Sequence, residues 1–315
     1  MKRIILLLLQ LSILLPIYGQ SYKMEKRIYI VDVTASMEGK GNVITPNIFS
    51  EVKQKLANTI EGISDSTTEI VIIPFTNTPH DAIKGETSRA DSLIKEIYDI
   101  NIKKGDTNIA DAWKQGLQEL DSHKVNYLFL LTDGLHNCGP SREELYDQLK
   151  SWEAISANNY YFAFYVMLTP NAKELEIAQI VNQTRQMWLI ESMDVNVSFI
   201  QSSLAISANV NQNNKVRIYF DSNKKAIFDE NVDFNIELED NPYYEIYDSR
   251  IYWKEGVAEF DIIELKPRME MPVEYNSKLY IKYDKEKYPL LFFTPEIIDF
   301  KILNKGVRTM KIREL

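Results

Sequence analysis

Two carboxylates and three hydroxyls stand where a strand-like run ends or a helical pattern begins. Asp32, Thr34 and Ser36 follow the apolar start of the segment IYIVDVTASMEGKG. Asp133 follows a second apolar run, in VNYLFLLTDG, and Thr107 lies in the turn GDTN ahead of a helical pattern. Asp, Ser and Thr are common turn formers, so an ordinary loop would explain each segment taken alone. Their shared chemistry depends on whether the fold brings the five oxygen donors together.

From about residue 26 to residue 207 the sequence alternates between short apolar runs and amphipathic segments. The apolar runs predict strands over residues 27–33, 69–75, 125–132, 160–168 and 186–190. Helical spacing of apolar residues predicts helices over 48–63, 88–100, 109–120, 141–155, 172–181 and 195–204. Continuous apolar strands separated by helices are typical of a mostly parallel sheet that is covered on both faces. The sequence therefore predicts a doubly wound α/β domain for this half.

A sheet of this kind would place the polar residues at one edge. Ligands bind beyond the carboxyl ends of parallel strands, where Asp32 and Asp133 are expected and where the turn that carries Thr107 can supply a third hydroxyl. Oxygen donors select a hard dication, and Mg²⁺ takes about six oxygens at roughly 2.0–2.1 Å. Zinc prefers His and Cys ligands. The three histidines of the chain lack the spacing of a zinc site, and we expect them on the surface. We therefore predict a Mg²⁺ site, with Mn²⁺ or Ca²⁺ as alternatives.

The same residues resemble the metal-ion-dependent adhesion site of the von Willebrand factor A (VWA) family. That site follows the pattern Asp-x-Ser-x-Ser, then a distant Thr, then Asp. The matching positions are Asp32, Thr34, Ser36, Thr107 and Asp133, and the resemblance covers about residues 25–206. It implies a Rossmann-like VWA fold in which Thr34, Ser36 and sometimes Thr107 bind the metal directly, while the two aspartates act largely through water. Thr34 departs from the pattern by replacing the first serine, but it keeps the hydroxyl.

The resemblance also implies how the metal is used. Neutral hydroxyls leave the charge of a dication poorly compensated, so a Glu or Asp of another protein can complete its coordination shell. We therefore expect a metal-dependent binding protein for adhesion or scaffolding, and not an enzyme. One alternative is a VWA-fold scaffold whose metal site stays unfilled. Another is a Mg²⁺-dependent phosphatase of the haloacid-dehalogenase type, which would need an acid where this sequence has Thr34.

The sequence pattern changes after residue 206. The stretch SANVNQNNK is polar and rich in turn formers, which is typical of a linker. Beyond it, apolar and polar residues alternate within 216–220, 232–239 and 258–262. Such alternation indicates strands with one buried face, so we predict a smaller all-β, sandwich-like domain over residues 207–315. Aromatic residues are dense between positions 243 and 253, which is explained either by a contact surface or, preferably, by core packing in strands.

The first twenty residues have the layout of a secretory signal. Lys2 and Arg3 precede an apolar run, and Gly19 is a small residue near its end. We expect cleavage after Gly19 or Gln20, with an uncleaved anchor as the alternative. The predicted division is therefore a signal peptide over 1–20, the VWA domain over 21–206 and the β-rich domain over 207–315. The mature protein is expected in the periplasm, the cell envelope or the extracellular space, without a further transmembrane segment.

The bulk composition excludes some partners. The formal net charge is −9 at pH 7, which argues against binding to nucleic acids and against electrostatic docking on anionic lipid. A hydrophobic content of 45% with 26% charged residues is that of a folded globular protein. The single cysteine, Cys138, rules out an intramolecular disulfide, and we expect it in a loop.

Overall fold

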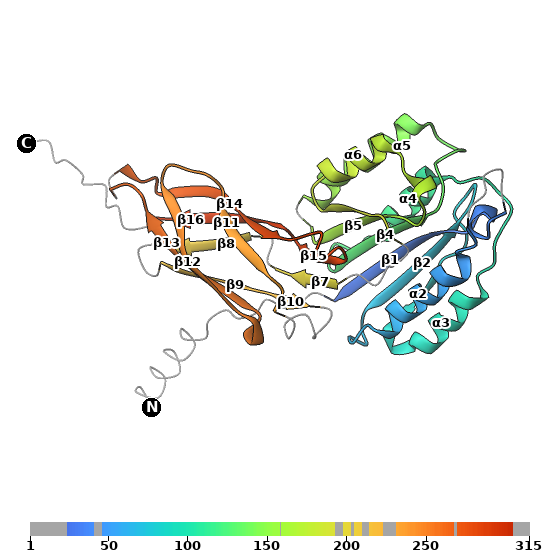
Figure 1. The fold of residues 1–315 in the computed structure, drawn as a ribbon, viewed down its shortest axis with the longest axis horizontal. Helices are drawn as coiled ribbons and strands as arrows, with labels where there is room; N and C mark the ends of the chain where they lie inside the picture. Colours follow the sequence, from blue (N-terminus) through green and yellow to red (C-terminus); the bar gives the residue numbers. More distant parts are fainter. Residues whose placement is uncertain are drawn as a thin grey trace, which may run out of the picture.

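The computed structural model describes most of the chain between residues 24 and 304. The described ranges are 24–40, 46–157, 159–192, 198–202, 205–209, 214–222, 231–267 and 270–304. The predicted signal segment and part of the predicted linker lie outside them. The described residues form an α/β half and an all-β half, which lie side by side along the long axis of the molecule (Figure 1).

A six-stranded sheet forms the centre of the N-terminal half, in the order β3-β2-β1-β4-β5-β6. Its strands are β1 (Glu25–Asp32), β2 (Glu69–Phe75), β3 (Ile83–Glu86), β4 (Val125–Thr132), β5 (Tyr161–Met167) and β6 (Met187–Ile190). Neighbouring strands are parallel, except that β3 runs antiparallel to β2 at one edge. β4 is buried along its whole length, as its continuous apolar sequence predicts.

Helices cover both faces of this sheet because successive strand residues point to opposite sides. One face packs against α2 (Phe49–Glu61) and α3 (Ala90–Asp99). The other packs against α4 (Ile109–Gln118), α5 (Arg142–Ser156) and α6 (Leu175–Gln183). Figure 1 shows the two groups of helices on opposite sides of the sheet. Short 3₁₀ turns complete this half, η1 (Ala35–Met37), η2 (Thr87–Arg89) and η3 (Pro170–Ala172). The predicted doubly wound α/β fold is confirmed.

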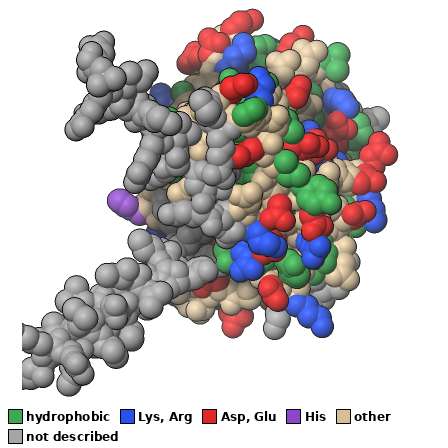
Figure 2. Space-filling view, turned by 90° about the vertical axis from the view of Figure 1, so that its left-hand side faces the viewer, with side chains coloured by type: hydrophobic (Ala, Val, Ile, Leu, Met, Phe, Trp, Pro, Cys, Tyr) green, Lys and Arg blue, Asp and Glu red, His purple; other side chains and the backbone are tan. Residues whose placement is uncertain are grey.

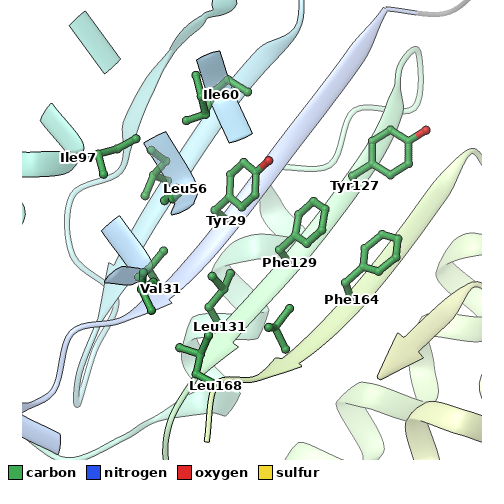
Figure 3. Close-up of a cluster of buried hydrophobic side chains, with 14 of the residues drawn as sticks. Tyr29, Val31, Leu56, Ile60, Ile97, Tyr127, Phe129, Leu131, Phe164 and Leu168 are labelled. Carbon is green, nitrogen blue, oxygen red and sulfur yellow. The ribbon is translucent and has the colours of Figure 1, made fainter. Parts of the chain in front are cut away.

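A row of aromatic rings crosses the α2 and α3 face of the sheet. Tyr29 of β1 stacks on Phe129 of β4 at 4.9 Å between ring centroids, and Phe129 stacks on Phe164 of β5 at 4.8 Å. Figure 3 shows these rings side by side, with Leu56 and Ile60 of α2 over the β1 end of the row. The β4 and β5 end of the row is covered by strands of the C-terminal half, as described below.

The C-terminal half consists of three small sheets, with the strand orders β10-β7-β15, β11-β14-β16-β8 and β12-β13-β9. Its strands are β7 (Ser198–Gln201), β8 (Ala205–Asn209), β9 (Lys215–Tyr219), β10 (Asp221–Ser222), β11 (Phe234–Leu238), β12 (Tyr244–Tyr252), β13 (Val257–Glu264), β14 (Glu274–Tyr283), β15 (Leu291–Thr294) and β16 (Ile297–Leu303). A 3₁₀ turn, η4 (Trp253–Glu255), joins β12 to β13. Their inward-facing side chains share one hydrophobic core. The predicted all-β domain is therefore confirmed.

The predicted helix over residues 195–204 is wrong, because β7 lies there. Phe199 and Ile200 are both completely buried, but they enter different cores, Phe199 that of the α/β half and Ile200 that of the β half. Opposite faces at successive positions require a strand, and a short apolar run cannot distinguish the two elements by spacing alone. β7 pairs with β10 and β15, which both follow the predicted domain boundary at residue 206. By strand pairing, residues 198–201 are therefore part of the C-terminal half.

Among the described residues, no helix has both the length and the apolar character needed to cross a membrane.

Candidate metal centre

The first segment of the site begins where β1 ends. Asp32 is completely buried there, and both of its carboxylate oxygens are held. Oδ1 accepts a hydrogen bond from the backbone N–H of Thr34 at 3.0 Å, and Oδ2 accepts one from the hydroxyl of Thr132 at 2.8 Å. Because Thr132 is the last residue of β4, Asp32 connects the carboxyl ends of two neighbouring strands.

The hydroxyls of this segment lie beside the second carboxylate. Thr34 Oγ1 and Ser36 Oγ are 2.9 Å apart, within hydrogen-bond distance. Ser36 Oγ donates to Asp133 Oδ1 at 2.9 Å. Four of the five predicted ligands, from two separate segments, are thus linked through short contacts at the edge of the sheet.

Thr107 reaches the same edge through the loop that follows β4. Its backbone N–H donates to Asn137 Oδ1 at 2.8 Å, and its carbonyl accepts from the Asn137 N–H at 3.0 Å. Thr107 Oγ1 lies 3.7 Å from the point that a β-carbon at Gly134 would occupy. The hydroxyl therefore faces the residue next to Asp133, and the structure brings all five predicted residues to one place.

Neither Asp32 nor Asp133 forms an ion pair with a Lys, Arg or His of the described residues. Burial raises the pKa of Asp32 to about 6, the nearby negative charge of Asp133 adds to the rise, and hydrogen bonds from Thr34 and Thr132 oppose it. Burial also raises the pKa of Asp133, although the hydrogen bond from Ser36 lowers it in part. Among the described residues, Asp133 Oδ2 is a buried oxygen without a hydrogen-bond partner.

This donor set fits a small, hard dication. A buried oxygen with open lone pairs costs free energy unless a donor or a cation compensates it. Hydroxyl and carboxylate oxygens are ligands that Mg²⁺ accepts, with water completing the octahedron. In the described part of the chain, no group of three or more His, Cys, Asp or Glu side chains is placed to hold a metal ion. A site here therefore depends on Thr34, Ser36 and Thr107 as well as on the carboxylates.

The sequence analysis missed the residues that support the site. Thr132 and Asn137 hold Asp32 and Thr107, as described above. His136 was predicted on the surface, which is wrong, because it is only 3% exposed. Its Nδ1 accepts from the backbone N–H of Ile109 at 3.1 Å, at the start of α4, and its Nε2 lies 2.6 Å from the carbonyl of Pro140. The position of these polar residues next to the TDG segment was the only signal in the sequence that they could support the site. Sequence spacing could not show that they bind residues about thirty positions away.

Comparison with known proteins finds a family match within the N-terminal half. Residues 28–136 match the family model of the von Willebrand factor type A domain. The matched segment contains all five predicted ligands, and the sheet around them is the doubly wound sheet that the resemblance implied. The predicted resemblance to the VWA family is therefore confirmed for this segment of the chain.

The chain is also similar, at low sequence identity, to solved structures of VWA proteins. The von Willebrand factor type A protein of Catenulispora acidiphila is 12% identical, with a TM-score of 0.43 over 84% of this chain and 63% of that one. The ArnB paralog VWA2 of Sulfolobus acidocaldarius is 13% identical, with a TM-score of 0.41 over 89% and 64%. No curated protein matches the chain.

A matrix protein of the mussel byssus is also similar. Proximal thread matrix protein 1 is 14% identical, with a TM-score of 0.42 over 55% of this chain. The chain spans 43% of the length of that mussel protein. One structure of the mussel protein is described as having a zinc-occupied metal-ion-dependent adhesion motif.

Proposed function

We propose that this chain is an exported protein that binds a partner through a divalent cation held by its VWA domain. Asp32, Thr34, Ser36, Thr107 and Asp133 would hold the cation, and a Glu or Asp of the partner would complete its shell. The observation that carries the proposal is the buried, unpartnered Asp133 Oδ2 beside Ser36, a position where a cation would remove the penalty of the open lone pairs.

Mg²⁺ is the proposed cation because the donors are oxygens only. Three of the five donors are neutral hydroxyls, so the protein supplies at most two negative charges to the ion. When bound, the ion would lower the pKa values of both aspartates, which burial and mutual repulsion now raise. Because its charge is not overcompensated, the bound ion would also bind a carboxylate of a partner protein. This is the recognition that we assign to the site.

The proposal assigns binding and no catalysis to this domain. Position 34 carries a hydroxyl, whereas acid–base catalysis of phosphoryl transfer from Asp32 would need an acid there. Purified protein is expected to leave aryl phosphates intact in Mg²⁺. Turnover that disappears in Asp32→Asn would contradict this assignment.

Export rests on the N-terminal sequence alone. Sequencing the amino terminus of the mature protein from the envelope or medium should find Gln20 or Ser21 as the first residue. Recovery of the uncleaved chain from membranes would favour the anchored alternative.

Calorimetric titration with Mg²⁺ tests the metal site. Native protein should release or absorb heat with a stoichiometry near one, and Asp133→Asn should lose it because the amide removes a charge from the site. Asp91→Asn, an exposed aspartate on α3, is the matched control and should titrate like the native protein. Titrations with Mn²⁺, Ca²⁺ and Zn²⁺ rank the alternatives. If the native protein binds none of these ions, the domain is a scaffold with an unfilled site.

Capture of the partner tests the role of the metal. Immobilised native protein should retain a protein from an envelope extract in Mg²⁺ and release it in a chelator, whereas Ser36→Ala should retain much less. Ser92→Ala, which changes an exposed serine of α3, is the control. Retention that is unchanged by the chelator would separate partner binding from the metal and overturn the proposed mechanism.

A further inference from the structure

Two edge strands of the C-terminal half flank one groove. β11 ends the sheet β11-β14-β16-β8, and β12 ends the sheet β12-β13-β9. The groove between them has a volume of about 550 Å³, and it is lined by residues 235–241, 244–246 and 248–249 and by Leu265. This volume lies within the range of sites that bind ligands, roughly 300–1,000 Å³. Any occupant of the groove would meet the backbone of an edge strand.

The free edge of β11 offers regular backbone groups for pairing. On its other edge, the Glu239 N–H donates to a carbonyl of β14 at 2.8 Å. The Ile236 N–H is turned away from β14 and donates to the side chain of Asn235 at 2.9 Å. Because alternate residues direct their backbone groups to opposite edges, Phe234, Ile236 and Leu238 direct theirs to the free edge. No strand of the described chain pairs there.

β12 offers a less regular edge. Its pairing with β13 shifts register between Tyr247 and Arg250, and Asp248 within the shift has a φ of +52°. Such a bulge bends an edge strand and disrupts its row of backbone groups. The geometry therefore favours β11 as the strand that accepts a partner, with β12 as the opposite wall of the groove.

The groove is acidic. The described residues that line it include no Lys, Arg or His but five carboxylates, those of Glu237, Glu239, Asp240, Glu245 and Asp248. Asp248 pairs with Arg250 at 2.5 Å, and the other four form no ion pair within the described part of the chain. Figure 2 shows that acidic side chains are widespread on the end of the molecule formed by the C-terminal half.

The lysines near the groove do not pair with its carboxylates. Lys266 and Lys282 lie over the rings of Tyr243 and Tyr280, at 5.2 and 5.1 Å from the ring centres. Lys278 lines two other pockets and, among the described residues, forms no ion pair. An occupant that carries cations would therefore supply charge pairing that these lysines do not provide.

A buried hydroxyl also lacks a partner at this groove. Tyr244 lines the groove where β12 begins, and it is 2% exposed. Its Oη has no hydrogen-bond partner among the described residues. An unsatisfied buried hydroxyl costs free energy, which a polar group of an occupant would recover. This observation is independent of the charges and also indicates an occupant.

The sequence that follows the described chain has the charge that the groove lacks. Residues 305–315, KGVRTMKIREL, contain four cations and one carboxylate, which give a net charge of +3 in a chain with a net charge of −9. Met310 and Ile312 alternate with Lys311 and Arg313. In an extended segment, this alternation places the apolar side chains on one face and the cations on the other.

β11 has a matching alternation. Its apolar residues pack in the core, and Glu237 and Glu239 lie on the opposite face of the strand. An added strand whose apolar residues continue the core would place Lys311 and Arg313 beside these carboxylates. Opposite charges on neighbouring strands stabilise their pairing.

The described chain ends within reach of the groove. β16 and β11 both run antiparallel to β14, so β16 ends on the side where β11 ends. Ile302 of β16 lies opposite Tyr275, whose ring centre is 5.8 Å from that of Tyr244. Two strand spacings of about 4.8 Å separate β16 from β11, a distance that residues 305–308 can span at roughly 3.3 Å per residue. Residues 309–315 are then enough to run back along the five residues of β11.

We propose that residues 305–315 dock in this groove as an added antiparallel strand on the free edge of β11. Docking would pair the open backbone groups, bring cations to the unpaired carboxylates and protect the edge from other chains. The groove is thus a strand-acceptor site for a basic segment in which apolar and charged residues alternate. This inference does not depend on the metal site, which lies in the other half of the chain.

Amide hydrogen exchange measured by NMR on the full chain tests the docking. The N–H groups of Ile236 and Leu238 should exchange at least about tenfold more slowly in the native protein than in Lys311→Glu/Arg313→Glu, because the reversed charges are repelled by the groove. The protection should weaken as salt is raised. Both substitutions lie outside the described ranges, so the variant should keep the fold of the native protein.

Two further variants separate docking from a general effect of charge. Lys95→Glu/Lys150→Glu makes the same change of charge at two exposed lysines of the α/β half, and it should leave the exchange unchanged. Glu237→Lys/Glu239→Lys, combined with Lys311→Glu/Arg313→Glu, should restore the protection because the two strands again carry opposite charges.

The proposal is overturned if Ile236 and Leu238 exchange equally fast in the native protein and the Lys311→Glu/Arg313→Glu variant. It is also overturned if the combined variant restores no protection. A synthetic peptide of residues 305–315 should bind that Lys311→Glu/Arg313→Glu variant at least about tenfold more tightly than the native protein, and equal binding would show that the native groove is open. Protection that disappears on dilution, together with a dimer in light scattering, would assign the groove to a second copy and also contradict the proposal.

Discussion

At the scale of single residues, the main feature of the site is the cost of burying two negatively charged carboxylates. Asp32 and Asp133 are buried close to one another, and hydrogen bonds from Thr34, Thr132 and Ser36 only partly offset the cost. The folded protein therefore holds one or both protons more tightly than an unfolded chain would. A dication would remove this cost, so the metal should contribute to the stability of the fold as well as to binding.

The stability of the metal-free protein should fall as the pH rises through the raised pKa of Asp32. The folded pKa of about 6 exceeds the ordinary value of 3.8, so the contribution of Asp32 is fully present below about pH 4 and lost above about pH 6. The loss is on the order of 3 kcal/mol. Urea unfolding in a chelator, compared between native protein and Asp32→Asn, measures it. Equal pH dependence of the two proteins would show that Asp32 titrates normally.

At the scale of elements, two segments fix the position of Thr107: the start of α4 and the loop that follows β4. Asn108 caps α4 through its Oδ1, which accepts from the Asp111 N–H at 3.1 Å, and its Nδ2 donates to the Asn77 carbonyl at 2.8 Å. Gly139 of the facing loop has a φ of +83°, and a β-carbon there would lie 2.2 Å from Asn108 Nδ2. The glycine thus allows the loop to approach the cap.

Gly139→Ala should destabilise the fold by about 2–3 kcal/mol, combining about 1–2 for the left-handed backbone with about 1 for the disturbed cap. It should also weaken Mg²⁺ binding, because Thr107 precedes the cap. Gly62→Ala is the control, since Gly62 ends α2 with a φ of −76° and its nearest contact would be 3.3 Å. Chemical denaturation and calorimetry measure both effects. If both variants change the free energy of unfolding and Mg²⁺ binding equally, the close approach of Gly139 to Asn108 does not contribute to stability.

At the scale of the whole molecule, β7 and β15 join the two halves. Phe199 of β7 stacks on Tyr127 of β4 at 4.1 Å between ring centroids, and Phe292 of β15 meets Phe164 of β5 at 5.1 Å. Gln201 donates to Glu25 Oε1 at 2.9 Å. Strands of the β half thus cover the part of the α/β sheet that α2 and α3 leave open, so we expect the two halves to unfold together.

Phe199→Ala should cost about 3–5 kcal/mol, because it opens a cavity in a core shared by both halves. Hydrogen exchange under mild denaturant should show β4 and β14 losing protection at the same denaturant concentration in the native protein. Tyr98→Ala changes a ring that is 48% exposed and should alter stability by no more than about 0.5 kcal/mol. Loss of protection in β14 well before β4 would show that the halves unfold independently.

The sequence determined the elements whose pattern is local. Residues 125–132 form β4 within the predicted bounds, because a continuous apolar run needs cover on both faces. The order of the other strands and helices in the α/β half also follows from such patterns, but the edge strand β3 was not predicted. The five candidate oxygen donors could be predicted to lie together because strand ends and helix starts bring defined positions to one edge of a parallel sheet, and the structure places them at that edge.

Only the tertiary structure decided what depends on distant contacts. Residues 198–201 form a strand because Phe199 and Ile200 face two different cores, which no local spacing reveals. His136 is buried because the start of α4 and the carbonyl of Pro140 bind its ring. The exposure of Tyr247 and the burial of Tyr244 depend on which face of β12 meets the core. In each case at least one of the stabilising partners lies far along the chain, so the outcome is decided only when the sheets and helices assemble.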